Sequence, residues 1–222
     1  MPANPENAKH TSKSLYWLLA VSALVAGFML YLMNKTPQQP PTLEAATLLM
    51  PAKVVSPQGL VDHNGKPFAS PQLQGHYSFI FFGYTHCPDI CPATLYQFKT
   101  MAKMLQSSPE LYARTRFILV SVDPQRDTPA QLKEYVKYYH PDFIGVTGPA
   151  DSIKTFSRQM GVIYERREPE DKDSDNYIVD HSSAILMTNP DGHLQVIFSA
   201  PHNAQTLVKD YQSIYNFLEG KS

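Results

Sequence analysis

The sequence predicts an α/β fold in which a central β-sheet is flanked by helices. Apolar runs that are typical of buried strands, such as residues 77–83, alternate along the chain with segments of helical spacing, such as residues 93–105. Two turn sequences, Asn64-Gly65 and Asn189-Pro190-Asp191-Gly192, lie between short apolar segments and predict β-hairpins. With 43% hydrophobic residues among 222, the chain can bury a core of ordinary size without disulfide support.

The strands and helices are expected in an order that places a parallel pair of strands in the sheet. After the hairpin around residues 64–65, strands are predicted at residues 77–83, 116–122, 162–165, 183–187 and 194–198, a short apolar piece at 143–146, and helices at 93–105, 129–139, 151–160 and 204–218. The strand–helix–strand rhythm implies that the first two core strands pair in parallel through a right-handed crossover. Thr128 and Pro129 begin the second helix, because the hydroxyl caps free N–H groups and proline at the first helical position loses no hydrogen bond. Residues 43–53 show only weak organisation.

A charged stretch interrupts this pattern late in the chain. Residues 165–176 (ERREPEDKDSDN) carry six carboxylates against three basic residues and no apolar anchor, which predicts a mobile surface loop. The loop is either simply solvated or a docking site for a partner, and its position just before His181 keeps the second interpretation open. The formal net charge of the chain is −1 and no cluster of Lys and Arg could follow a phosphate backbone, so nucleic acid is not expected as a partner.

The N-terminal part of the chain predicts a membrane anchor. Residues 15–33 (LYWLLAVSALVAGFMLYLM) give 19 positions without a charge, which as a helix span about 28 Å, close to the ~30 Å core of a bilayer. A cleaved signal peptide is the main alternative, but this stretch is longer than the usual apolar region of about 7–15 residues and no clear cleavage site follows it. Lys9 and Lys13 precede the segment and Lys35 follows it, which favours a cytoplasmic N-terminus.

These features divide the chain into four predicted parts. Residues 1–14 form a cytoplasmic tail, residues 15–33 a transmembrane anchor, residues 34–50 a Pro-rich stalk and residues 51–222 the globular domain. Because the tail is not rich in arginine and contains an acidic residue, a mitochondrial transit peptide is disfavoured. The expected location is the bacterial inner membrane, with the globular domain facing the periplasm and the anchor in contact with the lipid bilayer.

The only two cysteines of the chain, Cys87 and Cys91, lie between an apolar strand and a helix. Both thiols are therefore expected near a helix N-terminus, where free N–H groups and the helix dipole favour the thiolate over a free thiol, whose pKa is about 8.5. A reactive or metal-binding pair is the natural interpretation. A structural disulfide is the alternative, but a loop closed over so few residues yields little entropic stabilisation.

Two thiolates do not complete a trigonal site for a soft metal, and His181 is the candidate for a third ligand. It precedes a strand that, in a thioredoxin-like sheet, runs beside the CxxxC turn, in the place where thioredoxins usually carry a cis-proline. His86 adjoins Cys87, but adjacent side chains at a strand end point apart. Met101 and Met104 have helical spacing and are expected in the core. The other histidines of the soluble part are expected at the surface: residues 63, 76, 140, 193 and 202.

Three separated motifs make the chain resemble a known family. They are Tyr84-Thr85-x-Cys87-Pro88-Asp89-x-Cys91-Pro92, Val122-Asp123-Pro124-x-Arg126-Asp127-Thr128-Pro129, and Asp180-His181-Ser182 followed by Pro190-Asp191-Gly192. In this order, over about residues 50–220, they resemble the Sco/SenC family of copper chaperones, which assist assembly of the binuclear copper A centre of cytochrome c oxidase. The resemblance implies that Cys87, Cys91 and His181 bind copper, that Asp123 lies nearby as an outer carboxylate, and that a single membrane anchor holds the domain outside the cytoplasm. Leu186 stands where the family often has an aromatic residue, which bears only on local packing.

The chemistry of the residues agrees with copper. Two thiolates and one imidazole suit Cu(I), and the same atoms can bind Cu(II) when a water or carboxylate completes the shell, whereas structural zinc prefers four protein ligands. The leading hypothesis is a metallochaperone that passes copper to the copper A subunit of cytochrome c oxidase, with a copper donor and a thiol reductant of unknown identity as further partners. The alternative is a membrane-tethered thiol–disulfide oxidoreductase in which Cys87 and Cys91 are the redox pair, acting on oxidase cysteines or in redox defence. Against it, CxxxC is one residue longer than the CxxC of redox exchangers, and His181 has no necessary part in exchange.

Overall fold

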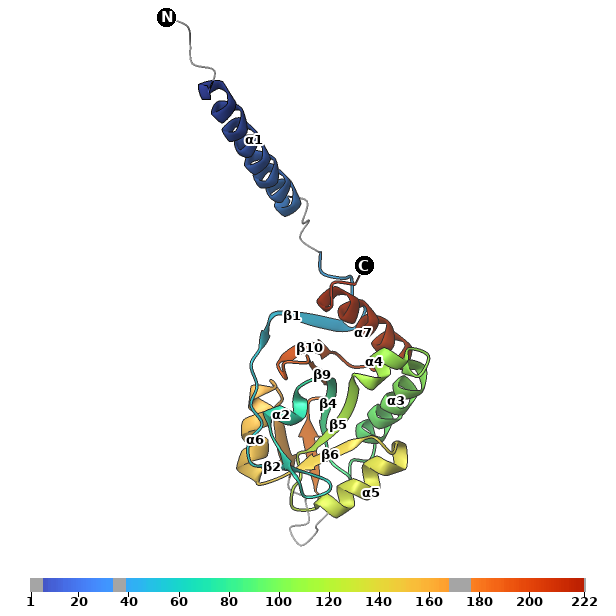
Figure 1. Cartoon of the computed structure of the whole chain (residues 1–222). Helices are drawn as coiled ribbons and strands as arrows, with labels where there is room; N and C mark the ends of the chain where they lie inside the picture. Colours follow the sequence, from blue (N-terminus) through green and yellow to red (C-terminus); the bar gives the residue numbers. More distant parts are fainter. Residues whose placement is uncertain (1–5, 34–38, 168–176, 222) are drawn as a thin grey trace, which may run out of the picture. The chain divides into compact units, whose positions relative to one another are not determined.

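A computed structural model describes residues 6–33, 39–167 and 177–221 of the chain. The chain divides into two compact units, Met1–Pro40 and Pro41–Ser222 (Figure 1). In the first unit the described residues include the helix α1 (Glu6–Met33), which begins earlier than the predicted segment 15–33. Among the residues described, no helix has the length and apolar character required to cross a membrane. The anchor at residues 15–33 therefore stays a prediction.

The second unit is built on an eight-stranded sheet whose three neighbouring strands β4 (Tyr77–Gly83), β5 (Thr115–Ser121) and β6 (Ile144–Thr147) are parallel. The remaining pairings in this sheet are antiparallel. In spatial order the strands are β1 (Ala46–Lys53), β10 (Leu194–Phe198), β9 (Ile185–Thr188), β4 (Tyr77–Gly83), β5 (Thr115–Ser121), β6 (Ile144–Thr147), β2 (Leu60–Asp62) and β3 (Pro67–Phe68). A separate antiparallel pair joins β7 (Tyr164–Arg167) and β8 (Ile178–His181). The α/β class and the predicted parallel pairing of residues 77–83 with the next core strand are confirmed.

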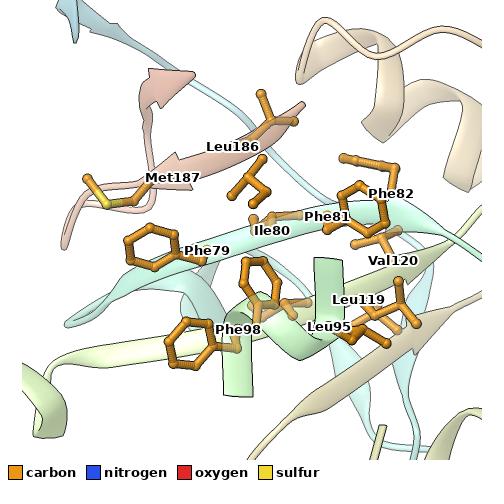
Figure 2. Close-up of a cluster of buried hydrophobic side chains, with 14 of the residues drawn as sticks. Phe79, Ile80, Phe81, Phe82, Leu95, Phe98, Leu119, Val120, Leu186 and Met187 are labelled. Carbon is orange, nitrogen blue, oxygen red and sulfur yellow. The ribbon is translucent and has the colours of Figure 1, made fainter. Parts of the chain in front are cut away.

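Helices cover both faces of the sheet (Figure 1). The helices α3 (Ile90–Leu105), α5 (Pro129–Tyr139) and α7 (Ala204–Leu218) lie on one face, α6 (Ala150–Gln159) lies on the other, and α2 (Ser70–Leu73) and α4 (Pro109–Ala113) are short. The strand β4 runs between these layers, and all seven of its residues are buried. Because successive side chains of a strand point to opposite faces, Phe79 meets Phe98 of α3 at 6.4 Å between ring centroids (Figure 2), whereas Phe82 meets Phe156 of α6 at 5.7 Å. This packing fixes the end of β4, where the cysteine motif begins.

Local sequence signals produce the turns and helix starts that were expected. Thr128 caps α5: its hydroxyl accepts from the backbone N–H of Gln131, and the Gln131 side chain reaches back to the N–H of Thr128. Gly65 and Gly192 take φ angles of +75° and +80° in the two hairpins, a region that favours glycine. Both hairpins are confirmed by the antiparallel pairs β2–β3 and β9–β10.

Among the boundaries that differ from the prediction are those of the globular domain and of the charged loop. The globular domain does not begin at residue 51, because residues 46–53, expected as stalk and weakly organised chain, form β1 and pair with β10. This edge strand is held by partners about 150 positions away and its register shifts between Leu48 and Lys53, so its sequence carries no regular alternation. The predicted mobile loop also begins too early, since residues 165–167 pair with β8, while residues 168–176 lie outside the described residues.

Candidate metal centre

The cysteine motif forms the turn between β4 and α3. The turn is closed by the N–H of Cys87, which donates to the carbonyl of Tyr84 at 3.3 Å. The helix begins at Ile90, three residues before the predicted start, so Cys91 lies in its first turn. Cys87 is 8% exposed and Cys91 is 0% exposed, so of the two residues only Cys87 keeps any contact with solvent. Both thiols are free, and both lie at the helix N-terminus, as the sequence predicts.

Gly83, the last residue of β4, makes room for the Cys91 sulfur. A Cβ atom at this position would lie 2.7 Å from Cys91 Sγ and 3.0 Å from Cε1 of Phe81. The sulfur therefore packs directly against the backbone at the end of β4, which a larger residue would prevent.

His181 ends β8 and brings its imidazole to the thiol pair. Its Nε2 lies 3.5 Å from Cys91 Sγ, and the ligand atoms of Cys87, Cys91 and His181 all lie within 4.8 Å of one another. The Nδ1 atom lies 3.0 Å from the carbonyl oxygen of Ser182. Because a carbonyl only accepts, Nδ1 carries the proton and Nε2 presents its lone pair toward the sulfurs. The ring is flanked edge-to-face by Phe81 and Tyr84 at 5.6 and 6.0 Å.

The two thiols have opposite tendencies to ionise. The pKa of Cys87 is held far below its usual value, chiefly by a hydrogen bond from the Cys91 thiol, with support from the backbone N–H groups of Asp89 and Cys91. The same hydrogen bond, together with burial, raises the pKa of Cys91. The pair thus holds one proton, on Cys91, and one negative charge, on Cys87. The expectation that both thiolates form easily is correct for Cys87 and wrong for Cys91, because burial beside an existing thiolate opposes a second charge.

The Asp127 side chain supports the turn between β4 and α3 through hydrogen bonds, and no role for it was predicted from the sequence. Its buried carboxylate accepts from the N–H and hydroxyl of Thr85, the latter at 2.6 Å, and from the hydroxyl of Ser121 at 2.7 Å. Burial raises the pKa of this carboxyl. Thr85 and Asp127 follow the carboxyl ends of two neighbouring parallel strands, and that pattern of polar residues was the signal available in the sequence.

Asp123, predicted to lie near the metal ligands, uses its carboxylate on other residues. One oxygen accepts from the hydroxyl of Tyr177 at 2.6 Å and the other from Nε of Arg126. The Arg126 guanidinium lies 3.5 Å from the centroid of the Tyr177 ring and 5.7 Å from that of Tyr84, whose ring faces His181. Asp123 is thus linked to the His181 imidazole indirectly, through the successive contacts of Arg126 and Tyr84. A direct role of Asp123 beside a metal stays a prediction.

The remaining histidines and the two methionines separate into surface and core groups. His86 is exposed and contacts the Thr85 hydroxyl through Nδ1 at 3.0 Å, outside the three-residue cluster. Met101 is fully buried and Met104 packs against the core, as expected. The prediction that His63 lies at the surface is wrong: it is 6% exposed, and its Nδ1 accepts the backbone N–H of Gly145 at 2.9 Å. His202 is also half-buried.

The family is decided by comparison with known proteins. Residues 47–216 match the SCO1/SenC family. The chain belongs to the SCO1/SenC family. It is 33% identical over 199 residues to an SCO2-like protein of Rickettsia prowazekii, which covers 88% of this chain and 95% of the relative. The resemblance inferred from the three motifs is therefore confirmed.

Solved structures of SCO1/SenC proteins share the fold. Arabidopsis thaliana ScoI, solved with copper bound, is similar at 31% identity with a TM-score of 0.66, over 74% of this chain and 98% of that chain. The apo Sco1 protein of Thermus thermophilus is similar at 30% identity with a TM-score of 0.68, over 78% of this chain and 97% of that chain. The predicted thioredoxin-like α/β architecture of the globular unit is confirmed by these matches together with the strand order.

Proposed function

We propose that this SCO1/SenC protein binds copper through Cys87, Cys91 and His181 and delivers it to the copper A site of cytochrome c oxidase. The observation that carries the proposal is the convergence of two sulfurs and one imidazole nitrogen within 4.8 Å. This soft, low-coordinate donor set suits Cu(I). Within the described part of the chain no fourth Cys, His, Asp or Glu joins the group, as a structural zinc site would require. A related ScoI was solved with copper bound.

The protonation pattern of the site supports copper as cargo. Cys87 already carries a negative charge, and the Nε2 lone pair of His181 already faces the sulfurs. Only Cys91 must lose a proton when the metal is loaded, so binding releases about one proton per ion near neutral pH. Copper affinity therefore falls on acidification, and formation of a Cys87–Cys91 disulfide removes both sulfur ligands.

The proposal includes a membrane anchor at residues 15–33, with the copper domain in the periplasm of a bacterial inner membrane. It is supported by the uncharged run of 19 residues and by the excess of lysines before it. Extraction of the full chain from membranes with alkaline carbonate tests the anchor, and labelling of Cys87 with a membrane-impermeant thiol reagent in spheroplasts tests the orientation. Release of the full chain by carbonate, or labelling only after lysis, would remove this part of the proposal.

The copper site is tested by anaerobic titration of the reduced protein with Cu(I) against a competing chelator. Wild type is expected to bind one ion with sulfur and nitrogen neighbours in X-ray absorption. His181→Ala should abolish tight binding while Cys87 and Cys91 still form and break a disulfide. His86→Ala is the matched control, because this exposed imidazole lies beside the motif but outside the cluster. Wild-type affinity in His181→Ala would overturn the proposed ligand set.

A thiol–disulfide oxidoreductase is the second candidate, and one observation favours it. Cys87 has a lowered pKa and keeps some exposed surface whereas Cys91 is fully buried, an arrangement suited to an attacking and a resolving thiol. Cys87 would attack a substrate disulfide and release one substrate thiolate. Cys91 would then displace the second, leaving a Cys87–Cys91 disulfide. Trapping of a mixed disulfide by Cys91→Ala with a model disulfide substrate would support this activity, and its absence would count against it.

A further inference from the structure

His202 holds the loop that carries His181, and nothing in the proposed copper site accounts for this residue. It lies between β10 and α7, and its Nε2 is 2.6 Å from the carbonyl oxygen of Ser183. Its other ring nitrogen, Nδ1, is buried and has no hydrogen-bond partner within the described chain. Since a carbonyl only accepts, Nε2 carries a proton that it donates to Ser183.

The loop that receives this bond is the link between β8 and β9. Residues 182–184 follow His181 directly and lead into Ile185. Two successive carbonyls of the loop accept imidazole protons: that of Ser182 from His181, at 3.0 Å, and that of Ser183 from His202, at 2.6 Å. The orientation of one peptide group restricts that of the next. The bond from His202 to the Ser183 carbonyl therefore restricts the neighbouring Ser182 carbonyl, which accepts the His181 proton and so sets the His181 tautomer.

The segment that carries His202 is also hydrogen-bonded to α3, the helix that carries Cys91. The N–H of Ala204, two residues after His202, donates to Oε1 of Gln97 at 2.9 Å. Gln97 lies on α3, six positions after Cys91 in the same helix. Residues 202–204 therefore connect the His181 loop on one side with the thiol-bearing helix on the other, by hydrogen bonds that involve no metal.

We propose that His202, supported by Gln97, is a positioning residue that holds the His181 imidazole within reach of the two sulfurs before copper arrives. The inference rests on the proposed copper site, because it concerns the readiness of that same ligand. A ligand fixed in advance loses less conformational freedom when the metal binds, which lowers the dissociation constant. A neutral donor of the right length is needed at position 202, which a glutamine amide supplies and a leucine of similar size does not.

The first test compares Cu(I) dissociation constants of the reduced full chain. His202→Leu is expected to raise the constant about tenfold, the lower end of the effect seen for residues that orient metal-binding histidines. His202→Gln keeps a donor and should stay within about threefold of wild type. His193→Leu is the matched control: this half-buried histidine lies in the hairpin at the other end of β9. Gln97→Leu, which removes the acceptor for Ala204, should weaken binding in the same direction.

The second test uses the metal-free protein. The ¹⁵N shifts of the His181 ring report which nitrogen carries the proton, and wild type and His202→Gln should show it on Nδ1. His202→Leu should show an exchanging mixture of tautomers. If His202→Leu fails to fold, Gln97→Leu provides the same comparison.

The outcomes separate the inference from the proposed function. Wild type that binds no Cu(I) through His181 would refute the copper site, and the metal-free spectra would still decide the role of His202. Wild-type copper affinity together with an unchanged His181 tautomer in a folded His202→Leu would refute the inference alone. An equal loss of affinity in His202→Leu and His202→Gln would also refute it, because the donor would then be irrelevant.

Discussion

Replacing Gly83 by alanine measures how tightly the Cys91 sulfur is packed against the end of β4. The added Cβ would lie 2.7 Å from Cys91 Sγ, 3.0 Å from Cε1 of Phe81 and 3.3 Å from Cδ1 of Leu119. Non-bonded heavy atoms prefer separations of about 3.5–4.0 Å, so the overlap with the sulfur is about 1 Å and exceeds the other two. The sulfur cannot move into solvent, because Cys91 is 0% exposed.

The expected cost follows from the effect of overpacking a buried site. Gly83→Ala should lower the free energy of unfolding of the reduced protein by about 2 kcal/mol, within the range of about 1–3 kcal/mol for added methyl groups in a core. In a Cys91→Ala background the shortest contact is absent, and the cost should fall to about 1 kcal/mol or less. Urea denaturation of the four proteins in this double-mutant cycle gives the coupling directly.

A second glycine provides the control. At Gly145 an added Cβ would lie 2.9 Å from Cβ of Leu132, between β6 and α5 and without contact to either sulfur. Gly145→Ala should be destabilising by a similar amount whether or not Cys91 is present. The reasoning is refuted if Gly83→Ala costs as much in the Cys91→Ala background as in wild type, because the clash would then not involve the sulfur.

Three further predictions concern ionisation and capping. Because the pKa of Cys87 lies far below its usual value, iodoacetamide should modify Cys87 at a nearly constant rate between about pH 5 and 7 and leave Cys91 intact. Peptide mass spectrometry measures both reactions. A tenfold fall in the rate of Cys87 modification per pH unit would contradict the assigned thiolate. Thr128→Ala removes the cap of α5 and should cost about 1 kcal/mol in urea denaturation, whereas Thr128→Ser should cost much less; equal losses would exclude the capping bond as the cause. The Arg114 guanidinium, whose Nη1 lies 3.0 Å from the Glu219 carboxylate, holds the pKa of that carboxyl below its ordinary ~4.3. The stabilisation from this ion pair is therefore fully present above pH ~4.3 and is lost as the pH falls through the lowered pKa. Glu219→Gln should therefore melt below wild type at pH 7 and approach it near pH 3, and a pH-independent difference would argue against the ion pair.

The elements that the sequence predicts best are those specified by their own residues. The strand at 77–83 and the helices at 129–139 and 204–218 are observed with the predicted bounds. The strand is a continuous apolar run with both faces buried. The helix at 129–139 is capped by Thr128 and the helix at 204–218 by Asn203. β1 was not predicted, because its order comes from pairing with β10 and not from its own pattern.

The same distinction applies to the site. Cys87, Cys91 and His181 were predicted to come together from residue chemistry and from the family motifs, and the structure places them within reach of one another. The roles of Gly83, Asp127 and His202 were not predicted, because each depends on a side-chain contact that appears only in the folded chain. Similarly, His63 is polar and lies in a turn, and only the position of the Gly145 N–H explains its burial.

The distance of 90 positions between Cys91 and His181 has a consequence for chain maturation. An unfolded chain offers two sulfurs that are close in sequence but an imidazole that is rarely near them, so an ion that takes all three donors selects the folded state. At a thousandfold excess over its dissociation constant, such an ion adds about 4.1 kcal/mol to the free energy of unfolding. A fully loaded protein should therefore resist heat and proteolysis better than the empty one, and turnover by proteases would fall first on chains that hold no ion.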